Sequence, residues 1–135
     1  MGYDNLKHIA GSIEVSQNLR SLDLSQNNLK NSGCLEIAKI LKRNTSLQKI
    51  NLNKNDIREE GLVKILQSLK ENKYLLTIKL EGNIFGITRG ILAIIGSLLT
   101  QENNTLQVML LTGSKQTLLS QELADGEAFD SIMIT

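Results

Sequence analysis

The sequence predicts a right-handed α/β solenoid, with a curved parallel sheet of four to five short strands on its concave face and helices on its convex face. Two observations lead to this fold class. A pattern typical of strands recurs every 28 residues, starting at Leu19, Leu47 and Leu75, and a pattern typical of helices follows each copy. A chain of 135 residues is long enough for one domain with a hydrophobic core.

The strand half of each period reads leucine-x-x-apolar-x-leucine-x-x-asparagine-x-apolar. Three copies begin at Leu19, Leu47 and Leu75. A fourth copy begins at Leu106 after an insertion of three residues, and it has Ser114 where the others have asparagine. Because side chains alternate between the two faces of a strand, the apolar positions are expected to face a core.

The helix half of each period has apolar residues at positions i, i+3, i+4 and i+7, which predicts one buried helix face. The segments with this spacing begin at Leu6, Cys34, Leu62 and Ile91. Gly33, Gly61 and Gly90 precede or open these segments, where a bare Cα lets backbones approach closely. Asn44, Asn72 and Asn103 follow them, and asparagine tolerates the left-handed conformation common at helix ends.

The repeats divide the single domain, residues 1–135, into shorter units. These are an N-terminal half repeat at 1–18, repeats at 19–46, 47–74 and 75–105, and a degenerate C-terminal repeat at 106–135. Phe129, Ile132 and Ile134 repeat the strand spacing once more and predict a terminal strand over 129–134. The alternative is an acidic tail without regular structure.

The stretch LRSLDLSQNNLKNSGCLEIAKILKRNTSLQKINLNKNDIREEG resembles leucine-rich repeats of the ribonuclease-inhibitor-like class, whose units are about 28 residues long. The resemblance runs from about residue 5 to Ser114. The class includes ribonuclease inhibitor, the sensor ends of NOD-like receptors, the Ran GTPase-activating protein, tropomodulins, and many cytosolic and ciliary proteins. It implies a module that binds proteins and performs no catalysis. Because no polar cap precedes the first strand, we also expect a fragment or short isoform of a longer array.

Composition argues against several other classes of function. A net charge of +1 gives the chain no overall electrostatic attraction for nucleic acid or a membrane surface. The apolar run from Ile91 to Leu99 is too short to cross a bilayer. The sequence has one histidine, His8, and no cluster of histidine, cysteine and carboxylate residues at metal-ligand spacing, so neither a metal nor a cofactor is expected. One cysteine, Cys34, and no export signal indicate a cytoplasmic protein, with the nucleus and cilia as alternatives.

The variable strand positions are expected to point to the concave face and to bind a protein partner. These candidate residues are Asp23, Ser25, Gln26, Lys49, Asn51, Asn53, Lys54, Thr77, Lys79, Glu81, Val108 and Leu110. They run from polar at the first strand, through a basic stripe of three lysines, to apolar at the fourth. Without aromatic residues for base stacking, this face does not predict nucleic-acid binding. An unused solvated face is the alternative.

Three further interpretations stay open at this point. A regulator of a nucleotide-binding enzyme, such as a GTPase-activating protein, would use a loop arginine, and Arg58 and Arg89 are so placed. A purely structural segment of a longer array needs no site at all. On the last helix, Leu92, Ala93, Gly96 and Leu99 form an apolar stripe that marks either a contact or a surface covered by Leu118, Leu119 and Leu123.

The repeated asparagines Asn27, Asn55 and Asn83 are expected to form a structural ladder. Each one leaves its strand where the chain turns toward the helix side. There a side-chain amide can pair with backbone groups that the turn removes from the sheet.

Overall fold

The computed structural model describes residues 2–86, 88–100, 105–111 and 132–134. Helices and strands alternate along the described chain as the repeats predict. The helices are α1 (Tyr3–Val15), α2 (Lys30–Arg43), α3 (Glu59–Leu69) and α4 (Arg89–Leu99). The strands are β1 (Ser21–Asp23), β2 (Lys49–Asn51), β3 (Thr77–Leu80), β4 (Val108–Leu111) and β5 (Ile132–Ile134).

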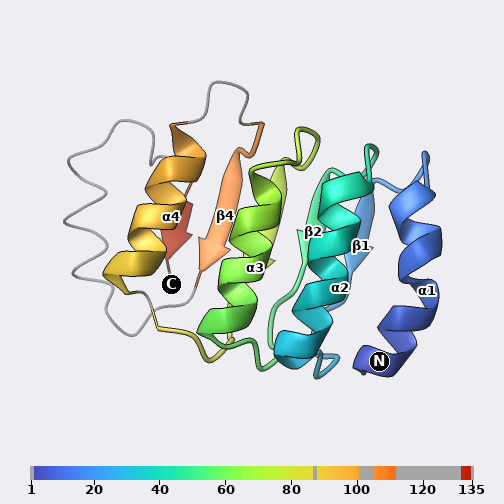
Figure 1. Ribbon diagram of the computed structural model, residues 1–135, viewed down its shortest axis with the longest axis horizontal. Helices are drawn as coiled ribbons and strands as arrows, with labels where there is room; N and C mark the ends of the chain where they lie inside the picture. The colour runs from blue at the N-terminus through green and yellow to red at the C-terminus, as the bar shows by residue number, and fades with distance from the viewer. Residues whose placement is uncertain (1, 87, 101–104, 112–131, 135) are drawn as a thin grey trace.

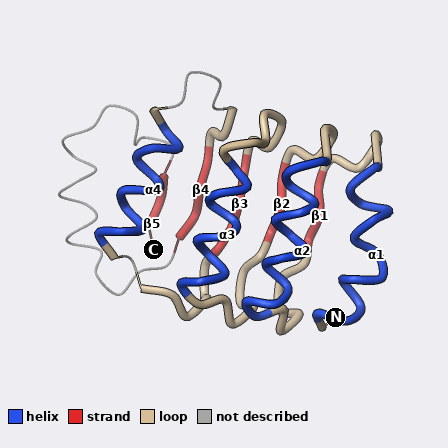
Figure 2. Tube along the Cα trace, viewed as in Figure 1, coloured by secondary structure: helices blue, strands red, loops and turns tan. Residues whose placement is uncertain are grey.

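The helices and strands form two layers (Figure 1). The strands make one parallel sheet in the order β1-β2-β3-β4-β5, and helices α1 to α4 all lie on the same side of it (Figure 2). The chain advances as a right-handed coil, the sense in which a twisted strand and the helix that follows it pack together. The predicted α/β solenoid is therefore confirmed.

Pairing between the strands keeps equivalent positions of the repeats side by side. Leu22 pairs with Ile50, which pairs with Ile78, at the 28-residue spacing of the sequence. The next partner of Ile78 is Met109, 31 residues on, so the three inserted residues lie outside the paired strands. The insertion leaves the register of the sheet unchanged.

The core lies between the two layers and is almost entirely aliphatic. Leu52 and Leu80 from the strand side and Ile65 from α3 are fully buried. Burial of one such side chain stabilises the fold by about 1.5–3 kcal/mol. Leu19 and Leu22 are only partly buried, because β1 is the first strand of the sheet and has a neighbour on one side.

A ladder of asparagine side chains lies where the strands end. The Oδ1 of Asn55 accepts the backbone N–H of Asn27 at 2.9 Å, and the Oδ1 of Asn83 accepts that of Asn55 at 2.8 Å. The Nδ2 of Asn55, whose side chain is fully buried, donates to the Leu24 carbonyl at 2.9 Å. Left without partners, such buried backbone groups would each cost about 1–3 kcal/mol.

Asn44 has a different role from the one predicted. Its backbone is extended, with φ −69° and ψ 134°, so the left-handed conformation expected at this helix end is wrong. The buried side chain instead joins two repeats. Its Oδ1 accepts the N–H of Leu47 at 2.6 Å, and its Nδ2 donates to the Ile13 carbonyl in the last turn of α1 at 2.7 Å.

Asn72 makes the equivalent contacts one repeat later. Its Oδ1 accepts the N–H of Leu75 at 2.7 Å, and its Nδ2 donates to the Leu41 carbonyl in the last turn of α2 at 2.8 Å. These side chains satisfy carbonyls that a helix end leaves without partners. The third predicted member, Asn103, lies outside the described residues.

The predicted role of the glycines holds at one position and fails at another. A Cβ on Gly61 of α3 would lie 2.5 Å from the Oδ1 of Asn31 and 2.8 Å from the Sγ of Cys34, so α2 and α3 approach closely there. A Cβ on Gly90 would meet only the Oγ1 of Thr88, at 3.7 Å, which is an ordinary contact. Close approach therefore does not explain the glycine at position 90.

The predicted apolar stripe of α4 belongs partly to the core. Leu92 is buried, whereas Ala93 is exposed. Leu118, Leu119 and Leu123, expected to cover the stripe, lie outside the described residues.

The last strand pairs in parallel with β4, with Ile132 opposite Met109. It lies within 129–134, where the sequence pattern predicts a terminal strand. Residues 112–131 are not among those described, so the boundaries of the 106–135 repeat stay a prediction.

Replacing Asn55 with leucine tests the ladder. Asn55→Leu removes the acceptor of the Asn27 N–H and the donor to the Leu24 carbonyl, and should lower the free energy of unfolding by about 2–4 kcal/mol in urea titrations followed by circular dichroism. Asn18→Leu, at an exposed asparagine before β1, is the matched control and should change it little. Equal stability of the two variants would contradict a structural role for the ladder.

Candidate functional site

The sheet has one face that α1 to α4 leave uncovered (Figure 2). We call it the open face. Along each of the first four strands, alternate residues turn inward and are the better buried, as Ile50 and Ile78 show. The residues between them belong to the open face. It therefore contains the strand positions predicted to bind a partner, and the remaining predicted positions lie at the rim where the strands end.

Strand pairing aligns these predicted residues into two rows across the open face. One row contains Lys49, Thr77 and Val108, which are direct neighbours on β2, β3 and β4. The other row consists of Asp23, Asn51, Lys79 and Leu110. Asp23, Lys49 and the rim residues Gln26 and Lys54 are exposed. The other predicted residues are partly exposed: Ser25, Asn51, Asn53, Thr77, Lys79, Glu81, Val108 and Leu110.

Some of these polar side chains also hold the strand ends in place, which sequence reasoning missed. The Oδ1 of Asp23 accepts the backbone N–H of Ser25 at 2.9 Å and its hydroxyl at 2.7 Å. The Oδ1 of Asn51 likewise accepts the N–H of Asn53 at 3.0 Å. Aspartate and asparagine commonly accept the backbone N–H two residues later in a turn. The sequence could therefore have predicted both contacts.

The Asp23 carboxylate is electrostatically stabilised in its charged form. Its pKa lies below the ordinary value for aspartate, chiefly because the Ser25 hydroxyl and then the Ser25 N–H donate to it. Lys79 and Lys49 lower it further through their positive charges. Asp23 is thus a fixed negative charge on the β1 side of the lysines.

At the rim, the chain turns away from the open face through left-handed residues. Gln26, Lys54 and Gly82 occupy equivalent repeat positions and have φ values of 57°, 56° and 71°. A Cβ on Gly82 would lie 2.7 Å from the Cγ of Lys54. The aliphatic stem of Lys54 therefore packs against Gly82, which brings its ammonium group toward the β3 side of the rim.

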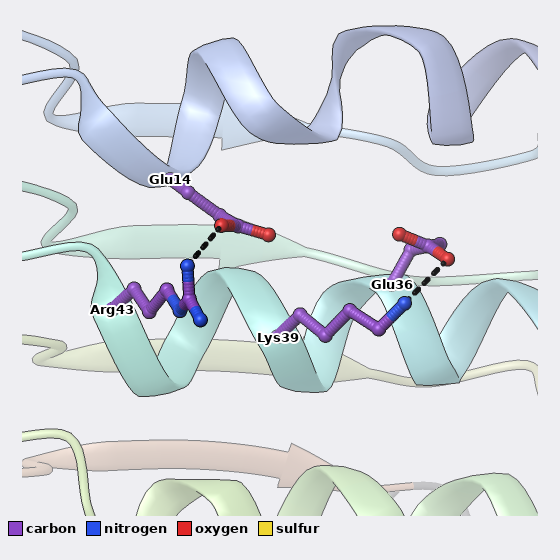
Figure 3. Close-up of polar contacts among 4 residues, drawn as sticks. All are labelled: Glu14, Glu36, Lys39 and Arg43. Atoms are coloured by element: carbon purple, nitrogen blue, oxygen red, sulfur yellow. Dashed lines mark hydrogen bonds and ion pairs between the residues drawn. The ribbon is translucent and has the colours of Figure 1, made fainter.

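The ion pairs of the described residues lie on the helix side. Arg43 of α2 lies 3.7 Å from Glu14 of α1, and within α2 Lys39 lies 3.2 Å from Glu36 (Figure 3). The third pair joins Lys42 to Glu71 at 3.8 Å. Among the described residues, none of these pairs involves a lysine of the open face.

A hollow lies at the edge where the strands lead into the helices. It has a volume of about 520 Å³ and is lined by Lys30, Asn31, Ser32, Asp56, Arg58 and Ile84. Arg58, one of the two arginines singled out in the sequence, is thus on its wall. Arg89, the other, is an exposed residue at the start of α4.

Asn31 shapes this edge and was missed by the sequence analysis. Its Oδ1 accepts the backbone N–H of Arg58 at 2.9 Å and that of Gly61 at 3.2 Å. A side chain of α2 therefore caps the N-terminus of α3, whose own preceding residue makes no side-chain cap. No local motif contains this signal, because the donor groups lie about one repeat further along the chain.

Cys34 is a buried core residue. Burial raises the pKa of its thiol to about 12, so the reactive thiolate is scarce at neutral pH. His8 is exposed on α1. Within the described ranges, no group of three His, Cys, Asp or Glu side chains is placed to bind a metal ion, and no helix has the length and apolar character to cross a membrane.

Comparison with known families now defines the class of protein. The family described as "Leucine Rich repeat" matches residues 15–38 and 43–66. The first segment contains β1 and most of α2, and the second contains β2 and most of α3. These two segments are leucine-rich repeats, and the whole described chain has the fold that such repeats build. A search of curated proteins finds no match to the sequence.

Two solved structures share the fold. The first is the leiomodin-1 actin-binding site 2, with a TM-score of 0.76 and 20% identity over 93% of this chain and 76% of that chain. The second is the C-terminal domain of tropomodulin from Caenorhabditis elegans, with a TM-score of 0.70 and 10% identity over 97% of this chain and 83% of that chain. At these identities the likeness establishes the fold alone.

The Asp23 turn predicts a measurable titration. Because the Ser25 hydroxyl is the main cause of the lowered Asp23 pKa, Ser25→Ala should raise that pKa toward its ordinary value. The carboxyl carbon shift of Asp23, followed by NMR against pH, reports it. Ser12→Ala on α1 is the control and should leave the Asp23 midpoint unchanged; an unchanged midpoint in Ser25→Ala would contradict the assignment.

Burial of Cys34 predicts low thiol reactivity. At about pH 8, an aromatic disulfide reagent should modify the native chain at least ~100-fold more slowly than the urea-unfolded chain, whose thiol has an ordinary pKa near 8.5. The variant Cys34→Ala with Ser12→Cys, which moves the thiol to an exposed position on α1, should react quickly in both states. Fast modification of native Cys34 would contradict its burial.

Proposed function

We propose that this chain is a non-catalytic protein-interaction module and that its protein partner binds the open face. The observation that carries the proposal is the pair of rows that cross β1 to β4. Neighbouring side chains in these rows are accessible and chemically varied, whereas the opposite side of the sheet is filled by helix packing. A rigid scaffold that presents varied side chains in fixed positions suits recognition of a protein surface.

The comparisons support the general class of this function. One solved structure of the same fold is named as an actin-binding site, so a protein of this shape is used to bind another protein. The likeness in fold is no evidence that this chain binds actin. Actin is therefore one of the partners that an experiment should include.

Charge reversal on the open face tests the proposal. The triple variant Lys49→Glu, Lys54→Glu and Lys79→Glu should lose partners that the wild-type chain retains in affinity capture followed by mass spectrometry, with purified actin tested in parallel. The matched control reverses three exposed lysines elsewhere, Lys7, Lys64 and Lys73, and should retain them. Both variants must melt like the wild type. If the first triple variant retains the same partners as the wild type and the control, the open face is not the binding surface.

A regulator of a nucleotide-binding enzyme is a second candidate, and one observation favours it. The backbone of Arg58 is held by Asn31 at the edge of the 520 Å³ hollow, as expected for an arginine that must project from an ordered loop. If this function is correct, the chain accelerates GTP hydrolysis by a GTPase, and Arg58→Ala abolishes the acceleration while Arg89→Ala does not. Lack of stimulation across a panel of small GTPases would argue against it.

A further inference from the structure

The polar groups of the open face are divided unequally between donors and acceptors. The oxygens of three side chains there are already bonded to backbone or hydroxyl donors. The Oδ1 of Asn51 accepts the N–H of Asn53 at 3.0 Å, and the Oδ1 of Asn53 accepts the N–H of Glu81 at 2.8 Å. One Asp23 oxygen is bound twice by Ser25. These three oxygens are therefore already engaged by donors of the chain itself.

The donors, by contrast, remain available. No side-chain nitrogen or oxygen of the described residues is buried without a hydrogen-bond partner. The Nδ2 groups of Asn51 and Asn53, which donate to no other described residue, are therefore open to solvent. Lys49, Lys54 and Lys79 add three ammonium groups on β2, β3 and the adjoining rim, and each offers only donors.

Two carboxylates share the face with these lysines and limit where a partner's negative charge can lie. Asp23 is on β1, at the edge of the sheet, and its charge is held by Ser25. Glu81 lies just after β3, at the rim. The strand portions of β2 and β3 thus carry positive charge and free amide donors, with no acidic side chain among Lys49, Asn51, Thr77 and Lys79.

The chemistry changes again on β4. Val108 and Leu110 are half-buried aliphatic residues, and they lie directly beside Thr77 and Lys79. Neighbouring strands are about 4.8 Å apart, and an extended peptide advances about 3.3 Å per residue. A segment that crosses the strands therefore passes from the donors of β2 to the aliphatic surface of β4 in about three residues.

We infer that the partner is an acidic protein segment, bound in extended form across the strands, with carboxylates over β2 and β3 and an aliphatic residue over β4. Carboxylates suit this face because they are acceptors only and form strong charge-assisted hydrogen bonds with ammonium groups. An aliphatic residue about three positions away covers Val108 and Leu110. This inference rests on the proposed function, since it specifies the partner of the same face.

The test uses a displayed library of random dodecapeptides, selected against the intact chain at low salt. Enriched peptides should carry a net negative charge, with aspartate or glutamate and a nearby aliphatic residue. Synthesised peptides should bind the Lys49→Gln, Lys79→Gln double variant at least ~10-fold more weakly than wild type in fluorescence anisotropy. Binding to the matched Lys7→Gln, Lys73→Gln variant should stay within about twofold of wild type.

The other outcomes separate this inference from the proposed function. If the enriched peptides are basic or purely apolar yet lose binding when Val108 and Leu110 are replaced by serine, the acidic partner is wrong and the open face remains the site. If no peptide is enriched, the extended acidic segment is wrong, and the affinity capture with the triple lysine variant still decides the open face. If binding is unaffected by every open-face variant, both proposals fail. If the two lysine double variants weaken binding equally, the attraction is a general charge effect and the acidic partner is also wrong.

Discussion

Asn55 bonds to the repeats on both sides of it, and the architecture of the repeats depends on this type of contact. Its side-chain oxygen accepts the backbone N–H of Asn27 in the preceding repeat, and its backbone N–H donates to the side-chain oxygen of Asn83 in the next repeat. Asn44 and Asn72 also join neighbouring repeats, at the other end of the strands. Each one donates to a carbonyl in the last turn of the helix one repeat earlier. Turns at both ends of a strand must expose backbone groups, and here a side chain from one repeat satisfies a group in its neighbour.

This constraint separates the residues that maintain the fold from those that can vary. Asparagines hold the turns and leucines fill the core, so the strand residues on the open face are not needed for core packing. Lys49, Thr77 and Val108 are neighbours in one row and differ in charge, size and polarity. The same backbone geometry can therefore present different surfaces, which is why the fold indicates binding in general and the side chains of the open face must identify the partner.

Asp23 and Asn51 lie on the boundary between these two groups. They were predicted as contact residues, and both also fix the turn after their strand through one oxygen. That internal use occupies one oxygen of each residue and leaves the amide nitrogen of Asn51 available beside the neighbouring lysines. Because these hydrogen bonds use acceptor oxygens, they leave a larger share of donor groups available to a partner on this face.

Much of the fold was determined by the sequence alone, because the repeat is periodic. The 28-residue spacing places Leu22, Ile50 and Ile78 in one register, and the alternation along each strand assigns the open face. Only the tertiary structure shows that Asn44 bonds to Ile13 with an extended backbone, that Asn31 caps α3 at Arg58, and which side-chain oxygens are occupied. The physical reason is the same in each case. These hydrogen bonds join neighbouring repeats or depend on the direction of one side chain, and residue spacing along the chain specifies neither.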